Sequence, residues 1–162
     1  MTTVAWDGKT LASDTQASTG SVVCSLSEQK IYTPPESGWE IYGSKVLAFG
    51  CSGDCGAEME LQDLLKHNLT YASEFLPTFS FTALAIIGAG RAYIITKEKG
   101  ETRASISLQV EPYAIGSGDL IARTAMHCGK NAREAVQVAI DLYCYSGGSV
   151  DSFPAGKQTE GK

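Results

Sequence analysis

The second residue of the chain carries the groups that a nucleophilic catalyst needs. Thr2 follows Met1, and a small residue at this position lets the initiator methionine be removed. Removal would leave a free α-amine and a hydroxyl on one residue. Because an α-amine titrates near neutrality, it can accept the hydroxyl proton, so that Thr2 would be its own general base. Taken alone, a threonine near an N-terminus is more typical of an ordinary strand residue.

Two charged residues downstream could act on this threonine, namely Asp14 and Lys30. An ammonium group beside Thr2 would favour a developing alkoxide and a neutral amine, since it lowers the pKa of both groups. Asp14 would hold that ammonium group in place, and strand alternation directs the neighbouring Ser13 and Thr15 to the other face. Considered separately, Asp14 and Lys30 are each typical of surface charges.

A glycine-rich turn, Gly116-Ser117-Gly118, follows the apolar segment 113–115 and precedes a predicted helix. Such a turn is also typical of a flexible strand-to-helix connection or of a nucleotide-binding loop. Only about 44 residues follow it, too few for the second half of a dinucleotide-binding sheet. We therefore rank a nucleotide-binding enzyme below the other interpretations.

Taken together, these residues resemble the proteasome β-subunit and HslV-like family of N-terminal nucleophile (threonine) hydrolases. The resemblance runs from Thr2 to about Phe153. The Asp14-x-Gln16 pattern is closer to the bacterial HslV peptidases, and Tyr143 stands where proteasome subunits usually carry an aspartate. The resemblance implies a threonine-type endopeptidase that cleaves peptide bonds with Thr2 after removal of Met1.

The same resemblance implies roles for further residues. Thr2 would be nucleophile and base, Asp14 and Lys30 would tune it, and Ser117 would hydrogen-bond the terminal amine. The oxyanion donor would be a backbone amide of the 50–53 segment, where Ser52 and Gly53 remain alternatives. Supporting positions would be Gly116, Gly118 and Ser146.

Assembly and partners are also implied by the resemblance rather than by the composition. Related subunits form closed homo-oligomeric rings or barrels, need no cofactor or metal, and degrade polypeptides together with a separate AAA+ unfoldase. Apolar residues of the predicted helix 54–68 are expected to contribute to self-association. If Met1 stays attached, Thr2 has no free amine. The alternative function is therefore a catalytically silent relative that serves as a structural ring or scaffold subunit.

Composition limits the other function classes. The chain has 162 residues, 43% of them hydrophobic and 19% charged, and a net charge of −5. An acidic chain argues against nucleic acid as a partner, because phosphate binding needs a basic face. No apolar run reaches membrane-spanning length and no signal peptide is apparent, so we expect a cytoplasmic protein. The five cysteines lack metal-ligand spacing and are expected to be small buried hydrophobes.

The periodicity of the chain predicts one domain over residues 1–153 and a polar tail over 154–162. Asp7-Gly8 favours a hairpin whose first strand spans Thr2 to Trp6. Residues 18–27 are expected to form a loop. Further strands are predicted at 30–33, 39–42, 45–49, 81–87, 92–96, 104–110 and 149–153, and helices at 54–68, 119–128 and 131–145, with Asp54 and Asn131 as N-caps. This pattern suits an α+β, four-layer αββα sandwich, the N-terminal nucleophile hydrolase fold that the resemblance implies.

Overall fold

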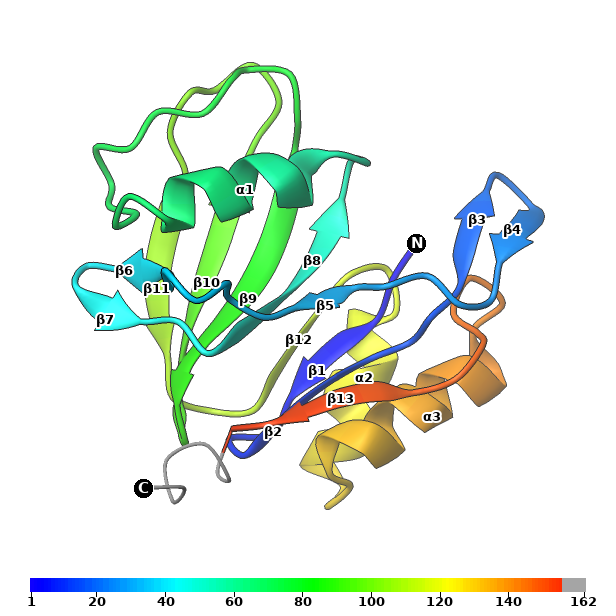
Figure 1. Ribbon diagram of the computed structural model, residues 1–162. Coiled ribbons are helices and arrows are strands. Elements are labelled where there is room, and N and C mark those ends of the chain that lie inside the picture. Colours follow the sequence, from blue (N-terminus) through cyan, green and yellow to red (C-terminus); the bar gives the residue numbers. More distant parts are fainter. Residues whose placement is uncertain (156–162) are drawn as a thin grey trace.

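The computed structural model describes residues 1–155, which form two larger antiparallel sheets packed against each other (Figure 1). One sheet has the strand order β12 (Tyr113–Ile115), β1 (Val4–Trp6), β2 (Thr10–Ser13) and β13 (Asp151–Pro154). The other has the order β11 (Ser105–Gln109), β10 (Arg91–Lys97), β9 (Phe81–Gly88), β8 (Ala48–Gly53) and β5 (Ile31–Tyr32). Strand β1 therefore lies in the interior of its sheet, as the sequence predicts.

The first hairpin forms at the predicted turn. Gly8 adopts a φ of 97°, a value that favours glycine, and the Asp7 carboxylate accepts hydrogen bonds from the backbone N–H groups of Lys9 and Thr10, both at 2.8 Å. The second oxygen of Asp7 accepts from the N–H of Ala132 at 2.8 Å. The turn is thus joined to the helix that begins there, which fixes β1 relative to that helix.

The core between the two sheets is fully apolar. Val4, Trp6 and Leu11 pack against Leu84 and Ile86, and none of these side chains is exposed. The sheets approach closely at β8, where a Cβ atom on Gly50 would overlap Val4. This packing holds the segment that precedes Val4 against the start of the second sheet.

Two helices cover the outer face of the four-stranded sheet, α2 (Asp119–His127) and α3 (Ala132–Leu142). The predicted capping box is present, since Asn131 Oδ1 accepts from Glu134 N at 2.8 Å and Glu134 Oε1 accepts from Asn131 N at 3.0 Å. One side of α3 packs on the sheet, whereas Leu142 is 73% exposed.

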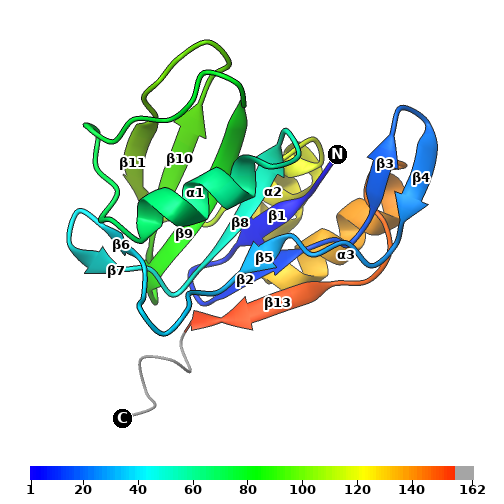
Figure 2. The same ribbon diagram turned by 45° about the horizontal axis from the view of Figure 1, so that its top comes forward.

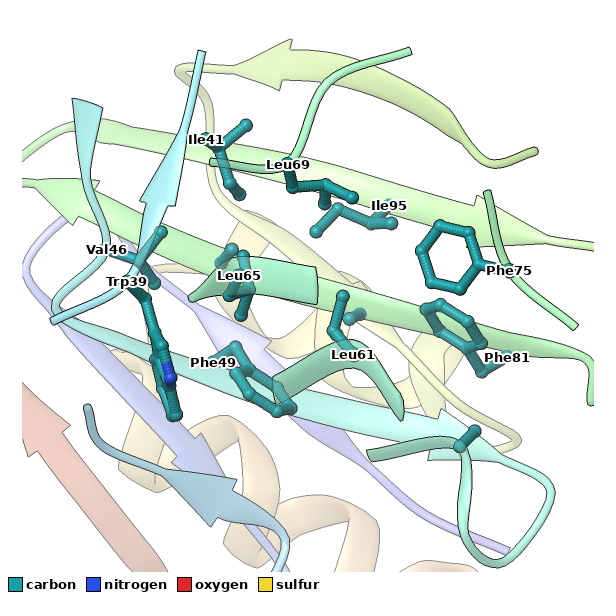
Figure 3. Packing of buried hydrophobic residues seen from close by; sticks show 13 residues of the cluster. Trp39, Ile41, Val46, Phe49, Leu61, Leu65, Leu69, Phe75, Phe81 and Ile95 are labelled. Carbon is teal, nitrogen blue, oxygen red and sulfur yellow. The ribbon is translucent and has the colours of Figure 1, made fainter. Parts of the chain in front are cut away.

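The outer face of the five-stranded sheet has a different cover. It consists of α1 (Ala57–Leu65), the small hairpin of β6 (Glu40–Ile41) and β7 (Ser44–Lys45), and the loops that follow α1 (Figure 3). The predicted N-cap is wrong: α1 starts after Gly56, and the Asp54 carboxylate instead accepts a hydrogen bond from Ser80 N at 2.9 Å. The helix also ends at Leu65, before the predicted end.

The expected α+β, four-layer αββα sandwich is wrong. The protein is mostly β-sheet, with 35% of its residues in strands and 19% in helices. A helix of nine residues does not make a helical layer over five strands. Non-helical segments supply much of that cover through Trp39, Ile41, Leu69 and Phe75, all buried in one cluster with Leu61 of α1. Helical periodicity suggested the helix 54–68 but gave no sign that these non-helical residues cover the sheet.

Three smaller predictions also need correction. Strands β3 (Ala17–Thr19) and β4 (Val22–Ser25) form a hairpin where a loop was expected, and it projects from the body of the molecule (Figure 2). Four of the five cysteines are exposed and Cys51 is partly buried, so they are not core residues. Pro154 belongs to β13 and Ala155 is buried, whereas the rest of the predicted tail, 156–162, lies outside the described residues. Among residues 1–155, no helix is long and apolar enough to cross a membrane.

Candidate active site

The turn 116–118 holds both main-chain polar groups of Thr2. The backbone N–H of Thr2 donates to Ser117 Oγ at 3.2 Å, and its carbonyl oxygen accepts from Gly118 N at 3.3 Å. Gly116 has a φ of 95°, and a Cβ atom there would overlap the Thr2 carbonyl oxygen. Glycine is required at this position for both reasons, and the predicted proximity of the turn to Thr2 is present.

Thr3 extends this arrangement toward the C-terminal part of the chain. Its hydroxyl lies 2.6 Å from Ser146 Oγ, and both side chains are buried. A Cβ atom on Gly118 would overlap the Thr3 hydroxyl. Gly118 and Ser146, which the sequence suggested as supporting residues, therefore both lie against the Thr3 hydroxyl. The sequence analysis did not single out Thr3, although it lies beside Thr2 at the start of a buried strand.

Asp14 is completely buried, and four hydrogen-bond donors satisfy its carboxylate. Oδ1 accepts from Thr3 N at 3.0 Å and from Lys30 Nζ at 2.9 Å. Oδ2 accepts from Gly147 N at 3.1 Å and from Gln16 N at 3.3 Å. A buried carboxylate needs such partners, because unpaired charge is strongly disfavoured away from water. Asp14 thus connects β2, the residue after Thr2 and the 146–147 segment in one place.

Lys30 is brought next to Thr2, but its contacts differ from the prediction. Its ammonium group donates to Asp14 and, at 3.1 Å, to the carbonyl oxygen of Met1, the peptide group directly before Thr2. Within residues 1–155, Lys30 forms no hydrogen bond with the Thr2 hydroxyl; its two acceptors are Asp14 and the Met1 carbonyl. Burial lowers the pKa of the Lys30 ammonium from its ordinary value of 10.5, and the attraction of Asp14 opposes this shift.

Strand geometry distinguishes the two candidate oxyanion donors. The N–H of Cys51 donates to the carbonyl oxygen of Lys30 at 3.3 Å, at the edge of β8 that faces β5. N–H groups two residues apart on a strand point to the same edge. The N–H of Gly53 is therefore directed to this edge, beyond the end of β5, where Gly53 lines a pocket together with Thr2. The N–H of Ser52 points to the opposite edge, toward β9, which favours Gly53 as the donor.

Searches for similar proteins found matches among solved structures only. Two structures of Thiobacillus denitrificans BPH, one of them in complex with epoxomicin, superpose with a TM-score of 0.59 at 17% and 19% identity. The alignments cover 94% of this chain and 96% and 95% of those chains. The two proteins share a fold. No protein-family model matches the sequence, and no curated protein matches it. At this identity the likeness concerns the fold alone.

A pocket of about 170 Å³ opens beside Thr2. The sequence analysis missed several residues that line it, in particular Tyr32, Cys51 and Glu58. Burial, followed by the negative charge of Glu58, raises the pKa of both Tyr32 and Cys51 to about 12. Within residues 1–155, no group of three or more His, Cys, Asp or Glu side chains could hold a metal ion. In the sequence, only the alternation along β8 could have suggested part of this lining, because it directs the backbone N–H groups of Cys51 and Gly53 to the same edge of the strand.

Proposed function

We propose that the protein is a threonine-type endopeptidase subunit, HslV-like or proteasome-like, that uses Thr2 as its nucleophile after removal of Met1. The observation that carries the proposal is the position of the Lys30 ammonium group. It lies 2.9 Å from the buried Asp14 carboxylate and 3.1 Å from the peptide carbonyl that precedes Thr2. An ion pair whose two side chains are only 6% and 0% exposed is an unusual arrangement for two surface charges. It suits a group that must act on Thr2.

The proposed reaction follows from these contacts. The Thr2 hydroxyl oxygen attacks the substrate carbonyl carbon, and the α-amine of Thr2 takes the hydroxyl proton. The Lys30 ammonium group favours the developing alkoxide and keeps the amine neutral, while Asp14 fixes Lys30. The N–H of Gly53 donates to the oxyanion. The amine then returns the proton to the leaving amide nitrogen, which leaves an acyl-threonine ester that water hydrolyses.

Met1 prevents this reaction while it is attached, since the nitrogen of Thr2 is then an amide without basic character. Ser117 already accepts a hydrogen bond from this nitrogen, so the same hydroxyl can orient the free amine after trimming. Removal of Met1 also takes away the Met1 carbonyl, one of the two acceptors of the Lys30 ammonium group, which can then donate to the Thr2 hydroxyl instead. The chains with and without Met1 therefore differ at the Thr2 nitrogen and in the acceptors of the Lys30 ammonium group.

We further propose that the subunit works as a homo-oligomeric ring on polypeptides delivered by an AAA+ unfoldase. The cytoplasm is the expected compartment, because all five cysteines are free. The surface that we expected to drive self-association does not support this, because Leu61, Leu65 and Leu69 are buried in the core of the same chain. Exposed apolar side chains lie instead on α2 and α3, where Leu120 and Leu142 are each 73% exposed.

Intact mass spectrometry tests the proposal directly. The purified protein should lack the mass of Met1, and incubation with epoxomicin, the compound in the Thiobacillus denitrificans BPH complex, should add one inhibitor mass. Thr2→Ala should give no adduct and no peptide cleavage, while a thermal melt shows an intact fold. Retained Met1 together with no adduct would instead support the silent ring or scaffold subunit.

A further inference from the structure

The pocket beside Thr2 carries a charge that the reaction itself does not need. Its walls come from the first residues of the chain, the start of β3, the segment leading into β5, the end of β8 with the turn after it, and the first turn of α1. Thr2 is 7% exposed and is one of the residues that line this pocket. A group that enters the pocket is therefore brought next to the proposed nucleophile.

Three carboxylates line the pocket, those of Glu28, Asp54 and Glu58. Lys30 has the one cationic side chain among the lining residues, and its charge is already balanced by Asp14 at 2.9 Å. None of the three carboxylates forms a salt bridge with a described residue. Asp54 and Glu58 accept hydrogen bonds from backbone N–H groups at 2.9 and 3.1 Å, which orients them and leaves their charge uncompensated.

Neutral groups provide the remaining surface. Tyr32 is partly buried and its hydroxyl donates to the carbonyl oxygen of Gln29 at 3.1 Å, while the thiol of Cys51 lies nearby on β8. Both groups stay protonated near neutral pH, since the pKa of each is raised to about 12. Glu58, in the first turn of α1, lines the pocket together with Tyr32 and Cys51. The pocket therefore combines apolar contact area with a negative charge.

The position of Met1 indicates which part of a substrate enters. Met1 lines the pocket, and its carbonyl group precedes the nitrogen of Thr2 in the chain. A residue on the acyl side of a peptide bond that is presented to Thr2 is thus placed at this pocket. Long aliphatic stems that end in a cation, as in lysine and arginine, match a neutral surface followed by carboxylates.

We infer that this pocket selects a lysine or arginine side chain on the acyl side of the scissile bond, with Glu58 as the main specificity-determining residue and Glu28 and Asp54 in support. The inference rests on the proposed peptidase function and names its substrate class. Glutamate at the same substrate position should be disfavoured by repulsion from the three carboxylates.

Four fluorogenic peptides that differ only in the residue before the fluorophore test this inference. With arginine, lysine, leucine or glutamate at that position, kcat/KM of the trimmed enzyme should be at least 10-fold higher for arginine and lysine than for leucine, and lowest for glutamate. Glu58→Gln, which keeps an acceptor for Gly56 N, should reduce the arginine-to-leucine ratio about 10-fold, and Glu58→Lys should reverse the order of arginine and glutamate. Glu28→Gln, on a different segment, should give a smaller reduction even if the Glu58 variants fold poorly.

Asp63→Asn is the matched control, because Asp63 lies on the same helix but is 77% exposed and does not line the pocket. It should leave the ratio unchanged. Equal or faster cleavage of the leucine peptide, or a ratio that neither Glu58→Gln nor Glu28→Gln alters, would overturn the inference while the peptidase function stands. No cleavage of any of the four peptides, with no Thr2-dependent epoxomicin adduct, would overturn both.

Discussion

The ammonium nitrogen of Lys30 lies 2.9 Å from Asp14 Oδ1, and the two side chains are 6% and 0% exposed. Both side chains are thus largely removed from water. Besides Lys30, three backbone N–H groups donate hydrogen bonds to the Asp14 carboxylate. Besides Asp14, the Lys30 ammonium group has one acceptor, the Met1 carbonyl oxygen. The carboxylate is therefore the better satisfied member of the pair, and the two residues should respond differently to substitution.

Lys30→Met should abolish peptide cleavage and leave the thermal stability of the protein nearly unchanged. The substitution removes the charge that favours the alkoxide and the neutral amine, and kcat/KM should fall roughly 1,000-fold. The three backbone donors continue to hold Asp14. Steady-state assays together with a thermal melt check this, and Lys45→Met, at an exposed position of β7, should keep full activity. Activity within a few-fold of wild type would exclude a role for Lys30.

Asp14→Asn should instead lower stability. An asparagine presents one oxygen and an NH₂ group to four donors, so at least one buried N–H group loses its acceptor and the Lys30 charge is left unpaired. Breaking one partner of a buried pair costs about 3–5 kcal/mol, and urea denaturation should show a loss in this range. A loss below about 1 kcal/mol would mean that water or a shifted side chain replaces the carboxylate.

Gly116→Ala should displace the nucleophile. The added Cβ atom would overlap the Thr2 carbonyl oxygen, and the φ of 95° is unfavourable for alanine. We expect a loss of about 2 kcal/mol or more in the free energy of unfolding and a loss of epoxomicin labelling. Gly88→Ala is the matched control, since a Cβ atom there meets nothing within 4 Å. Its effect should stay within about 0.5 kcal/mol.

Cys51 should react slowly with alkylating agents although it lines a pocket. A thiol whose pKa is about 12 is almost entirely protonated at pH 8, and the thiolate is the reactive form. Iodoacetamide should therefore modify the exposed Cys55 at least roughly 100-fold faster than Cys51, as measured by peptide mapping. In urea the difference should disappear. Equal rates in the native protein would contradict the raised pKa.

The same shift predicts a loss of stability at alkaline pH. Because burial raises the pKa of Cys51 from 9.0 to about 12, the folded protein keeps a proton that the unfolded chain releases. This contribution is fully present below pH 9 and is lost as the pH rises toward about 12. Between pH 8 and 10.5, wild type should lose about 1 kcal/mol more unfolding free energy than Cys51→Ser, less than the full shift implies because water reaches the pocket. Equal losses in both proteins would exclude this contribution.

Several features of the site follow from local sequence. The Asp7-Gly8 turn and the capping box at Asn131 form as predicted. Each depends on a side chain that accepts a hydrogen bond from a backbone N–H group two or three residues further along the chain. The positions of Asp14, Lys30 and the 116–118 turn near Thr2 were also expected, although only from the resemblance. Composition alone could not have brought together residues that lie more than a hundred positions apart.

Other features depend on tertiary contacts, and the sequence did not predict them. The end of α1 and the inward-facing Leu69 are determined by packing on the five-stranded sheet, so helical periodicity gave a helix that was too long and a layered fold that was wrong. The pocket beside Thr2 arises where five separate segments meet, and no segment carries a signal for it. The sequence by itself determined the first hairpin, the cap at Asn131 and the candidate nucleophile, because these depend on short-range bonding and residue type. Only the tertiary structure decided that Lys30 contacts the Met1 carbonyl and that Gly53 directs its N–H to the edge of β8 that faces β5, because both depend on strand register between segments distant in the chain.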